Sequence, residues 1–206
     1  MTNKEKSISK LRLDGGILCF DFINTIHSRN EENSHDYIKC YEDFIEWCEK
    51  VELLSGNQVN ELKLLVVKNP KKSKKNLKII KEAREILYLL FSNYSSKNKI
   101  DNEILEKYNS HLQQAFSKLV IKQTTDGVRV SLINEVDFLF PLRIIMKSSY
   151  DALTTFPRER IKECTSCGWI FLDKTKNAGR KWCNMKTCGS IDKSLRYYYR
   201  KKGAKK

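Results

Sequence analysis

The chain has 206 residues, of which 40% are hydrophobic and 31% charged, and its formal net charge is +14 at pH 7. This composition excludes an intrinsically disordered or collagen-like chain, and the length suffices for one compact domain and a small second unit. No segment is long and apolar enough to cross a bilayer, and the N-terminus lacks the apolar stretch of a secretory signal. We therefore expect a cytoplasmic protein without a membrane partner.

The first apolar segment, residues 15–29, has no single period and fits either a strand that enters a helix or one buried helix. It concentrates four polar side chains among apolar neighbours: Asp21, Asn24, Thr25 and Arg29. We predict that these four cluster as a ligand-binding site for a small-molecule effector. A buried polar network that ties the segment to the rest of the domain is an alternative of equal weight.

Apolar residues then recur at three- and four-residue steps, which is the period of a helix that packs on a core. Helices are predicted over about 37–54, 58–67, 77–94, 101–119 and 141–156. Asp101 is expected to cap the fourth of them and Pro141 to begin the fifth. The lysine-rich run KKSKK, residues 71–75, is expected to be a solvated connection, since such charge runs are usually linkers.

Two β-branched segments, LVIKQT and GVRVSLI, are joined through Thr125, Asp126 and Gly127. Asp-Gly suits a tight turn with positive φ, so the pattern predicts a small antiparallel hairpin. The predicted fold class is α+β, mainly α. We place a domain boundary at Pro157, between a helical domain of residues 1–157 and a small module of residues 158–206.

Four cysteines stand as two close pairs, Cys164 with Cys167 and Cys183 with Cys188. Two short knuckles of this kind can supply the four thiolates of a tetrahedral Zn²⁺ site. Two disulfides are the alternative, but free or metal-bound thiols fit better with a chain that has seven cysteines and no secretory leader. The other three are expected to be core residues that bind no metal: Cys19, Cys40 and Cys48.

The sequence around these ligands predicts a treble-clef finger. Gly168 can relieve crowding after the first knuckle, and residues 169–171 can form a short strand that covers the site. Ser190 can cap a terminal helix that runs to about Lys202. Knuckle, hairpin and helix together are the parts of a treble clef.

The positive charge is concentrated in this module, because residues 158–206 hold 15 Lys/Arg against 4 Asp/Glu. Nucleic acid is the favoured partner, with an anionic membrane surface or simple solubility as alternatives. Part of the charge, at Lys162, Lys181 and Lys186, can offset the formal charge of a Zn(Cys)₄ centre.

A helical wheel of the terminal helix separates an apolar side that can pack from a cationic side that can contact phosphates. The apolar side holds Ile191, Leu195, Tyr198 and Tyr199. The predicted nucleic-acid-binding residues are Arg180, Lys181, Lys193, Arg196 and Arg200. A solvated face with no partner is the alternative.

The stretch RIKECTSCGWIFLDKTKNAGRKWCNMKTCGS resembles the CGNR zinc finger: a first Cys pair, then Gly-aromatic-Phe-Asp, then basic residues before Trp-Cys-x-Met-x-x-Cys-Gly. The segment DFINT, residues 21–25, is similar to the ABATE domain that precedes this finger. The resemblance implies a bacterial, stress-induced transcription regulator, with a helical sensing or interaction domain joined to a DNA-binding finger. Ser190-Ile191 stands where the family has Asn-Arg, which puts the contact of that arginine in doubt.

We expect no enzyme activity; if there were any, the polar set Asp21, Asn24, Thr25 and Arg29, with Arg84 as a further candidate, would be the place to look. Four thiolate ligands would leave zinc without an open position, and His27, His35 and His111 lack metal-ligand spacing. An RNA-binding or ribosome-associated module and a protein-interaction finger are the alternatives to DNA binding. Candidate partners are therefore DNA or RNA, an effector or protein partner of the first domain, and a second copy in a homodimer.

Overall fold

The computed structural model describes residues 7–133 and 135–203, and it is mainly helical with two small antiparallel hairpins, as predicted. The predicted first domain, called the first domain below, holds η2 (Ile8–Lys10), α1 (Leu18–Ile23), α2 (Tyr41–Lys50), α3 (Gly56–Lys68), α4 (Pro70–Ser95), α5 (Asn102–Phe116), β1 (Leu119–Thr124), β2 (Gly127–Leu132) and α6 (Phe140–Thr155). The C-terminal module holds η3 (Arg158–Arg160), β3 (Ile161–Glu163), β4 (Ile170–Leu172), η4 (Met185–Gly189) and α7 (Ser190–Gly203).

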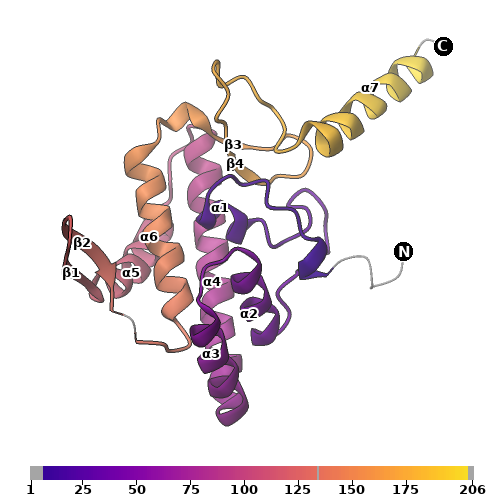
Figure 1. Ribbon diagram of the computed structural model, residues 1–206. Coiled ribbons are helices and arrows are strands. Elements are labelled where there is room, and N and C mark those ends of the chain that lie inside the picture. The colour runs from indigo at the N-terminus through magenta and orange to yellow at the C-terminus, as the bar shows by residue number, and fades with distance from the viewer. Residues whose placement is uncertain (1–6, 134, 204–206) are drawn as a thin grey trace.

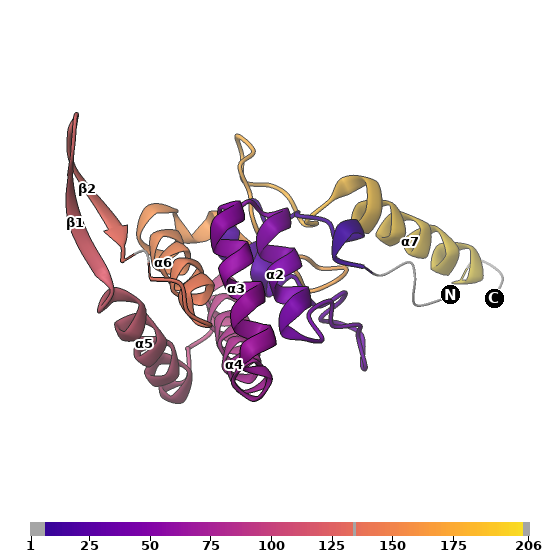
Figure 2. The same cartoon turned by 60° about the horizontal axis from the view of Figure 1, so that its bottom comes forward.

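Helix α4 is the central element of the molecule. It contacts α1, α2, α3 and α5, and also β3 and β4 of the C-terminal module (Figure 1). The short helix α1 lies against α4, α6 and β4. Helix α7 instead projects away from the body in both views (Figures 1 and 2). No helix in the described part of the chain has the length and apolarity needed to cross a membrane.

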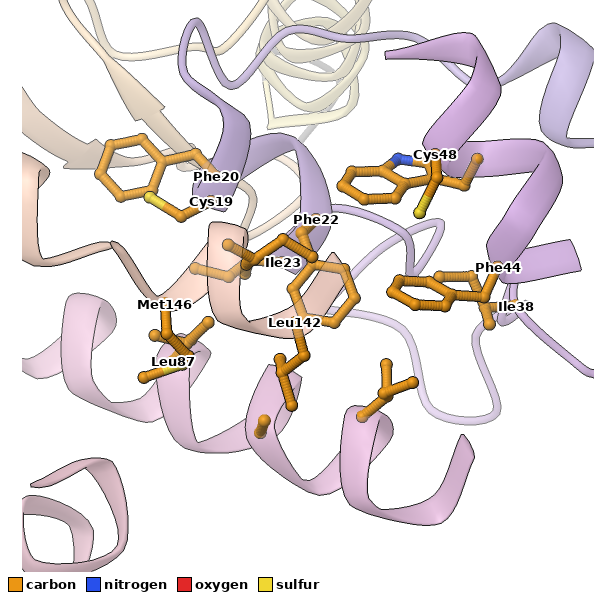
Figure 3. Close-up of a cluster of buried hydrophobic side chains, with 14 of the residues drawn as sticks. Cys19, Phe20, Phe22, Ile23, Ile38, Phe44, Cys48, Leu87, Leu142 and Met146 are labelled. Carbon is orange, nitrogen blue, oxygen red and sulfur yellow. The ribbon is translucent and has the colours of Figure 1, made fainter. Parts of the chain in front are cut away.

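The hydrophobic core is built around the aromatic side chains of α1 and α2 (Figure 3). Phe20 meets Phe91 of α4 edge-on at 4.8 Å between ring centroids, and Phe44 stacks on Trp47 at 6.0 Å. Cys19 and Cys48 are fully buried there, as predicted, but Cys40 is exposed at the start of α2, so its expected place in the core was wrong. The same buried cluster continues into the C-terminal module.

The predicted helices are present, although the first of them is shorter than predicted. Helix α2 begins only at Tyr41, because the carboxylate of Asp43 accepts hydrogen bonds from the backbone N–H groups of Lys39 and Cys40. It ends at Lys50, since Glu52 takes a left-handed conformation with φ 53°. Local capping therefore overrides the longer apolar period.

The lysine-rich run 71–75 is the largest error of the sequence-based prediction. It is not a connection but the first turns of α4, which begins at Pro70 and is separated from α3 by Asn69 alone. Proline suits the first turn of a helix, where its missing N–H has no helical partner. Lysine is also a good helix former, so neither residue type breaks the helix here.

The predicted cap of α5 and the predicted hairpin are present. Asp101 caps α5 by accepting a hydrogen bond from the N–H of Glu103 at 2.9 Å. In the hairpin, Thr124 pairs with Gly127, whose φ is 127°, so Thr125 and Asp126 form the two-residue turn instead of the predicted Asp126-Gly127 pair. The hairpin lies at the end of the molecule opposite α7 (Figure 2).

Candidate metal centre

The first two cysteines lie on the turn that joins β3 to β4. The N–H of Cys164 donates to the carbonyl oxygen of Trp169 at 2.8 Å, and the N–H of Gly168 donates back to Cys164 at 2.8 Å. These bonds close the knuckle and direct both side chains inward. The predicted covering strand is present as β4, shifted by one residue toward the C-terminus.

Glycine is required at position 168 for a reason besides the knuckle itself. Its φ is 72°, and a Cβ at this position would lie 2.6 Å from the Cβ of Arg29. The backbone of the first domain approaches here closely enough for the N–H of Arg29 to donate to the carbonyl of Cys167 at 2.7 Å. Only glycine combines this conformation with this approach.

Of the second pair of cysteines, Cys183 lies just before a single π-helical turn, η4, and Cys188 lies within it. This turn leads directly into α7. Asn184 caps this turn, because its side chain accepts a hydrogen bond from the N–H of Lys186 at 2.9 Å. Ser190 is not the cap that the sequence suggested. It is already helical, with φ −70° and ψ −41°, and its hydroxyl donates to the carbonyl of Met185.

The four sulfur atoms form one buried cluster, and all lie within 4.8 Å of one another. Sγ of Cys183 is 3.7 Å from Sγ of Cys167 and 3.7 Å from Sγ of Cys188. A tetrahedron with Zn–S bonds of about 2.3 Å has edges of about 3.8 Å, whereas a disulfide bond measures about 2.05 Å. The cysteines are therefore free thiols whose geometry fits one zinc ion.

Asp173 organises the spacer between the two pairs. It is fully buried and accepts hydrogen bonds from the N–H and hydroxyl of Thr175 and from the N–H of Arg180, at 2.6 to 3.0 Å. Burial opposes ionisation, but these bonds and the ammonium of Lys162 outweigh it and lower the pKa of Asp173. Lys162 therefore pairs with Asp173, whereas the sequence suggested that it offsets the charge of the zinc centre.

The two basic residues predicted in the spacer differ in their surroundings. The guanidinium of Arg180 lies 5.0 Å from the ring centre of Phe171 and donates to the carbonyl of Cys183, which holds the spacer against the finger. Lys181 is exposed. Both line a shallow hollow of about 400 Å³ together with Trp182.

Helix α7 does not have the packed side that its wheel suggested. Ile191, Leu195, Tyr198 and Tyr199 are 50% to 65% exposed. Its cationic residues are exposed as well, and Arg196 pairs with Asp192 one turn earlier at 2.7 Å. Lys193, Arg196 and Arg200 thus share one projecting helix, and no other element of the described chain covers it.

The finger is attached to the first domain by a buried pair of hydrogen bonds. The side-chain amide of Asn24 donates to the carbonyl of Ile170 at 2.8 Å and accepts from its N–H at 3.0 Å, as a neighbouring strand would. Trp169 adds a bond from its indole N–H to the carbonyl of Ile26 at 2.7 Å. Hydrogen bonds and a continuous hydrophobic core thus connect the residues on the two sides of the boundary that we predict at Pro157.

The N-terminal segment also contacts the finger, which the sequence analysis missed. The N–H of Leu172 donates to the carbonyl of Gly15, and the amide of Asn184 donates to Asp14. Arg12 lies over the ring of Trp169 at 5.2 Å. These partners are more than 150 residues apart in the chain, so no local pattern could have revealed them.

The four predicted ligand-binding residues lie near one another in sequence but face different neighbours. Asn24 bonds to β4, and Thr25 accepts a hydrogen bond from Arg84, which also binds Asp36 in a bidentate pair at 2.8 and 2.9 Å. Arg29 donates to Glu85 and lies over Tyr88. Asp21 accepts from the N–H of Gly15.

A cavity of about 1120 Å³ lies elsewhere, between α4 and α5. Its described lining includes Leu77, Ile86, Leu89 and Ile104 and none of the four predicted ligand-binding residues.

Comparison with known proteins agrees with the geometry of the sulfur cluster. Residues 160–201 match the family model of the CGNR zinc finger, and this match includes all four cysteines. No curated protein matches the chain. The C-terminal module, with four buried thiols arranged for one zinc ion, is therefore a CGNR zinc finger.

Proposed function

We propose that this protein binds duplex DNA through its zinc finger and acts as a transcription regulator. The observation that carries the proposal is the exposure of α7. A cationic helix that starts two residues after Cys188 and projects from the body has the size and charge to lie along or within a major groove. Lys181, Lys193, Arg196 and Arg200 would contact phosphates, while Arg180 would hold the spacer in position.

We propose a binding role rather than a catalytic one. If all four thiolates hold the zinc ion, its shell is complete and no position is left for a reactive water. The zinc would then stabilise the fold of the finger and orient the start of α7. The sensing or interaction role of the first domain and its effector stay predictions.

The test is the salt dependence of binding to a duplex of about 30 base pairs, measured by fluorescence anisotropy between about 50 and 200 mM salt. Arg196→Ala combined with Arg200→Ala should weaken binding on all sequences and flatten the log–log salt slope by up to about 2. Zinc content should stay unchanged, since neither residue contacts the sulfur cluster.

Lys10→Ala combined with Lys39→Ala is the matched control, because it removes the same charge from exposed sites outside the finger. An equal loss in both variants would mean that net charge, rather than α7, governs binding. An unchanged affinity and slope after the α7 substitutions would also contradict the proposal.

Single-stranded nucleic acid is a second candidate, which the tyrosines of α7 favour. Tyr197, Tyr198 and Tyr199 are 51% to 65% exposed, and Lys201 lies 4.9 Å from the ring centre of Tyr197. Exposed aromatic rings beside cations suit stacking on unpaired bases. Competition between duplex DNA, single-stranded DNA and RNA at one salt concentration would separate the two candidates.

A further inference from the structure

A second cationic surface lies on the first half of α4, far along the helix from the finger. Residues 62–81 contain eight lysines and no acidic residue. Six of these lysines are exposed on α4 and at the end of α3, and we call them the lysine face: Lys68, Lys71, Lys72, Lys74, Lys75 and Lys78.

The lysine face has few anionic neighbours. Lys78 approaches Glu82 at 3.9 Å, but within residues 7–133 and 135–203 no carboxylate pairs with the other five lysines. The three remaining cations nearby differ, since Lys63, Lys81 and Arg84 each pair with a carboxylate of α2, α4 or the loop before α2. Five of the six charges of the lysine face therefore have no ion-pair partner among the described residues.

This arrangement is unfavourable for the helix itself. Lys71 and Lys75, like Lys74 and Lys78, are four residues apart, and like charges at this spacing destabilise a helix. Lys71 and Lys72 also lie in the first turn of α4, which contains no acidic residue and where the helix dipole disfavours cations. A bound polyanion would offset both unfavourable effects.

We propose that the lysine face is a second phosphate-binding surface that contacts the backbone of duplex DNA. From Lys71 to Lys78 the row is about 10 Å long, at about 1.5 Å per residue, which covers roughly three phosphates of one strand. Lysines act as point charges without base recognition, so this surface adds affinity that is independent of sequence. The inference rests on the proposed function and extends it to the first domain.

The two cationic surfaces lie toward opposite ends of α4. The finger contacts the second half of this helix, where Ser92 donates to Glu163 of β3 at 2.6 Å. Lys74 precedes Ser92 by 18 residues, which is about 27 Å along the helix. The first turns of α4 thus lie far from α7 (Figure 1). The lysine face would therefore contact a different stretch of the DNA backbone from the one that α7 contacts.

An anionic lipid surface is the competing partner, because two aliphatic side chains are exposed on α3 near the lysine face. Leu64 is 58% exposed and Val67 is 80% exposed. A bilayer would bury them, whereas a phosphate backbone would not. The extended row of charges and the proposed DNA-binding finger in the same chain favour the duplex.

The experiment compares two full-length variants that lose the same charge. One replaces four residues of the lysine face by alanine: Lys71, Lys72, Lys74 and Lys75. The other replaces four scattered, exposed lysines: Lys10, Lys39, Lys99 and Lys122. Binding to a duplex of about 30 base pairs is measured over a range of salt, together with circular dichroism and zinc content.

We expect the lysine-face variant to lose at least about tenfold in affinity near 100 mM salt and about 2 in salt slope, because each phosphate contact releases about 0.9 counterion. The scattered variant should lose much less. Equal losses in the two variants, or an unchanged slope in the lysine-face variant, would overturn the inference while leaving the finger proposal intact.

Two further outcomes are distinct. If the α7 substitutions have no effect but the lysine-face substitutions do, the inference stands and the placement of the main site on the finger fails. The wild type could instead bind anionic phosphatidylglycerol vesicles and not DNA, and the lysine-face variant could fail to bind these vesicles. The lysine face would then be a lipid-binding site, and the inference would be overturned.

Discussion

The two halves of the CGNR finger have similar residues in opposite environments. In residues 160–189 the arginine and tryptophan that pack are engaged: Arg180 lies over Phe171, and Trp169 is buried against the first domain, whereas Lys181 is exposed. In α7 the same residue types, among them Arg200 and Tyr197, are exposed. A basic-aromatic composition alone therefore does not identify a binding surface, and burial decides which half is structural.

The largest effect that can test this comparison is loss of zinc from the buried half. Cys183→Ser should release the metal and unfold the finger, because structural zinc contributes on the order of 10 kcal/mol to small finger modules. Melting of the first domain should also shift, since β4 belongs to the shared core. Zinc per chain and thermal circular dichroism measure both effects.

The control is Cys40→Ser, at an exposed position outside the sulfur cluster, which should keep one zinc per chain and the wild-type melting temperature. A full complement of zinc in the Cys183→Ser protein would contradict the assignment.

A matched pair of isoleucines separates the two halves directly. Ile170 in β4 is fully buried, whereas Ile191 in α7 is 54% exposed. Ile170→Ala should lower the free energy of unfolding by about 2–5 kcal/mol, because it leaves a cavity in the core. Ile191→Ala should change it by less than about 0.5 kcal/mol. Urea unfolding measures both, and a large effect at Ile191 would mean that α7 packs on something in solution.

Loss of the hydrogen bonds that attach the finger to the first domain should lower the free energy of unfolding nearly as much as Ile170→Ala. Asn24→Ala would leave the buried N–H and carbonyl of Ile170 without partners, at a cost of about 2–4 kcal/mol. Asn30→Ala is the control, because Asn30 also bonds to the finger, at Ser166, but from an exposed position. Equal effects of the two substitutions on urea unfolding would contradict the view that the buried Asn24 bonds stabilise the protein more than the exposed Asn30 bond.

The smallest effect concerns Asp21, and it depends on pH. Burial raises the pKa of Asp21 to about 6, above its value of about 3.9 in an unfolded chain. Folding therefore favours the protonated form, so the contribution of Asp21 to stability is full below about pH 4 and is lost as pH rises through about 6.

Asp21→Asn mimics the neutral form and can still accept the hydrogen bond from Gly15. It should stabilise the protein by about 1–3 kcal/mol near pH 8 and by about 1 kcal/mol less near pH 5. Chemical unfolding at the two pH values tests this. A stability difference that is the same at both would contradict the raised pKa.

Local patterns predicted most of the helices, the cap of α5 by Asp101 and the presence of the β1–β2 hairpin, because these features depend on residues only a few positions apart. The prediction for α2 was too long because Asp43 binds the preceding N–H groups and sets the start of the helix. The run 71–75 was misassigned because charge was taken as a sign of a linker, although lysine favours helices.

In the candidate site, too, the sequence indicated individual residues, whereas their partners depend on the tertiary structure. The sequence pointed to Asn24 and Thr25 as notable polar residues, but their partners, Ile170 and Arg84, are set by tertiary packing. Asp36, the second partner of Arg84, carried no local signal. The predicted pocket of four residues and the domain boundary at Pro157 stay predictions.

The sequence by itself determined the metal centre, because four thiols at close spacing can reach one zinc ion through short-range turns alone. Only the tertiary structure decided which charges are free. It placed Arg180 against Phe171, left the basic and aromatic side chains of α7 exposed, and made the lysines of residues 71–75 an exposed helical row. Those outcomes depend on which surfaces far apart in the chain meet, and such long-range packing leaves no local pattern in the sequence.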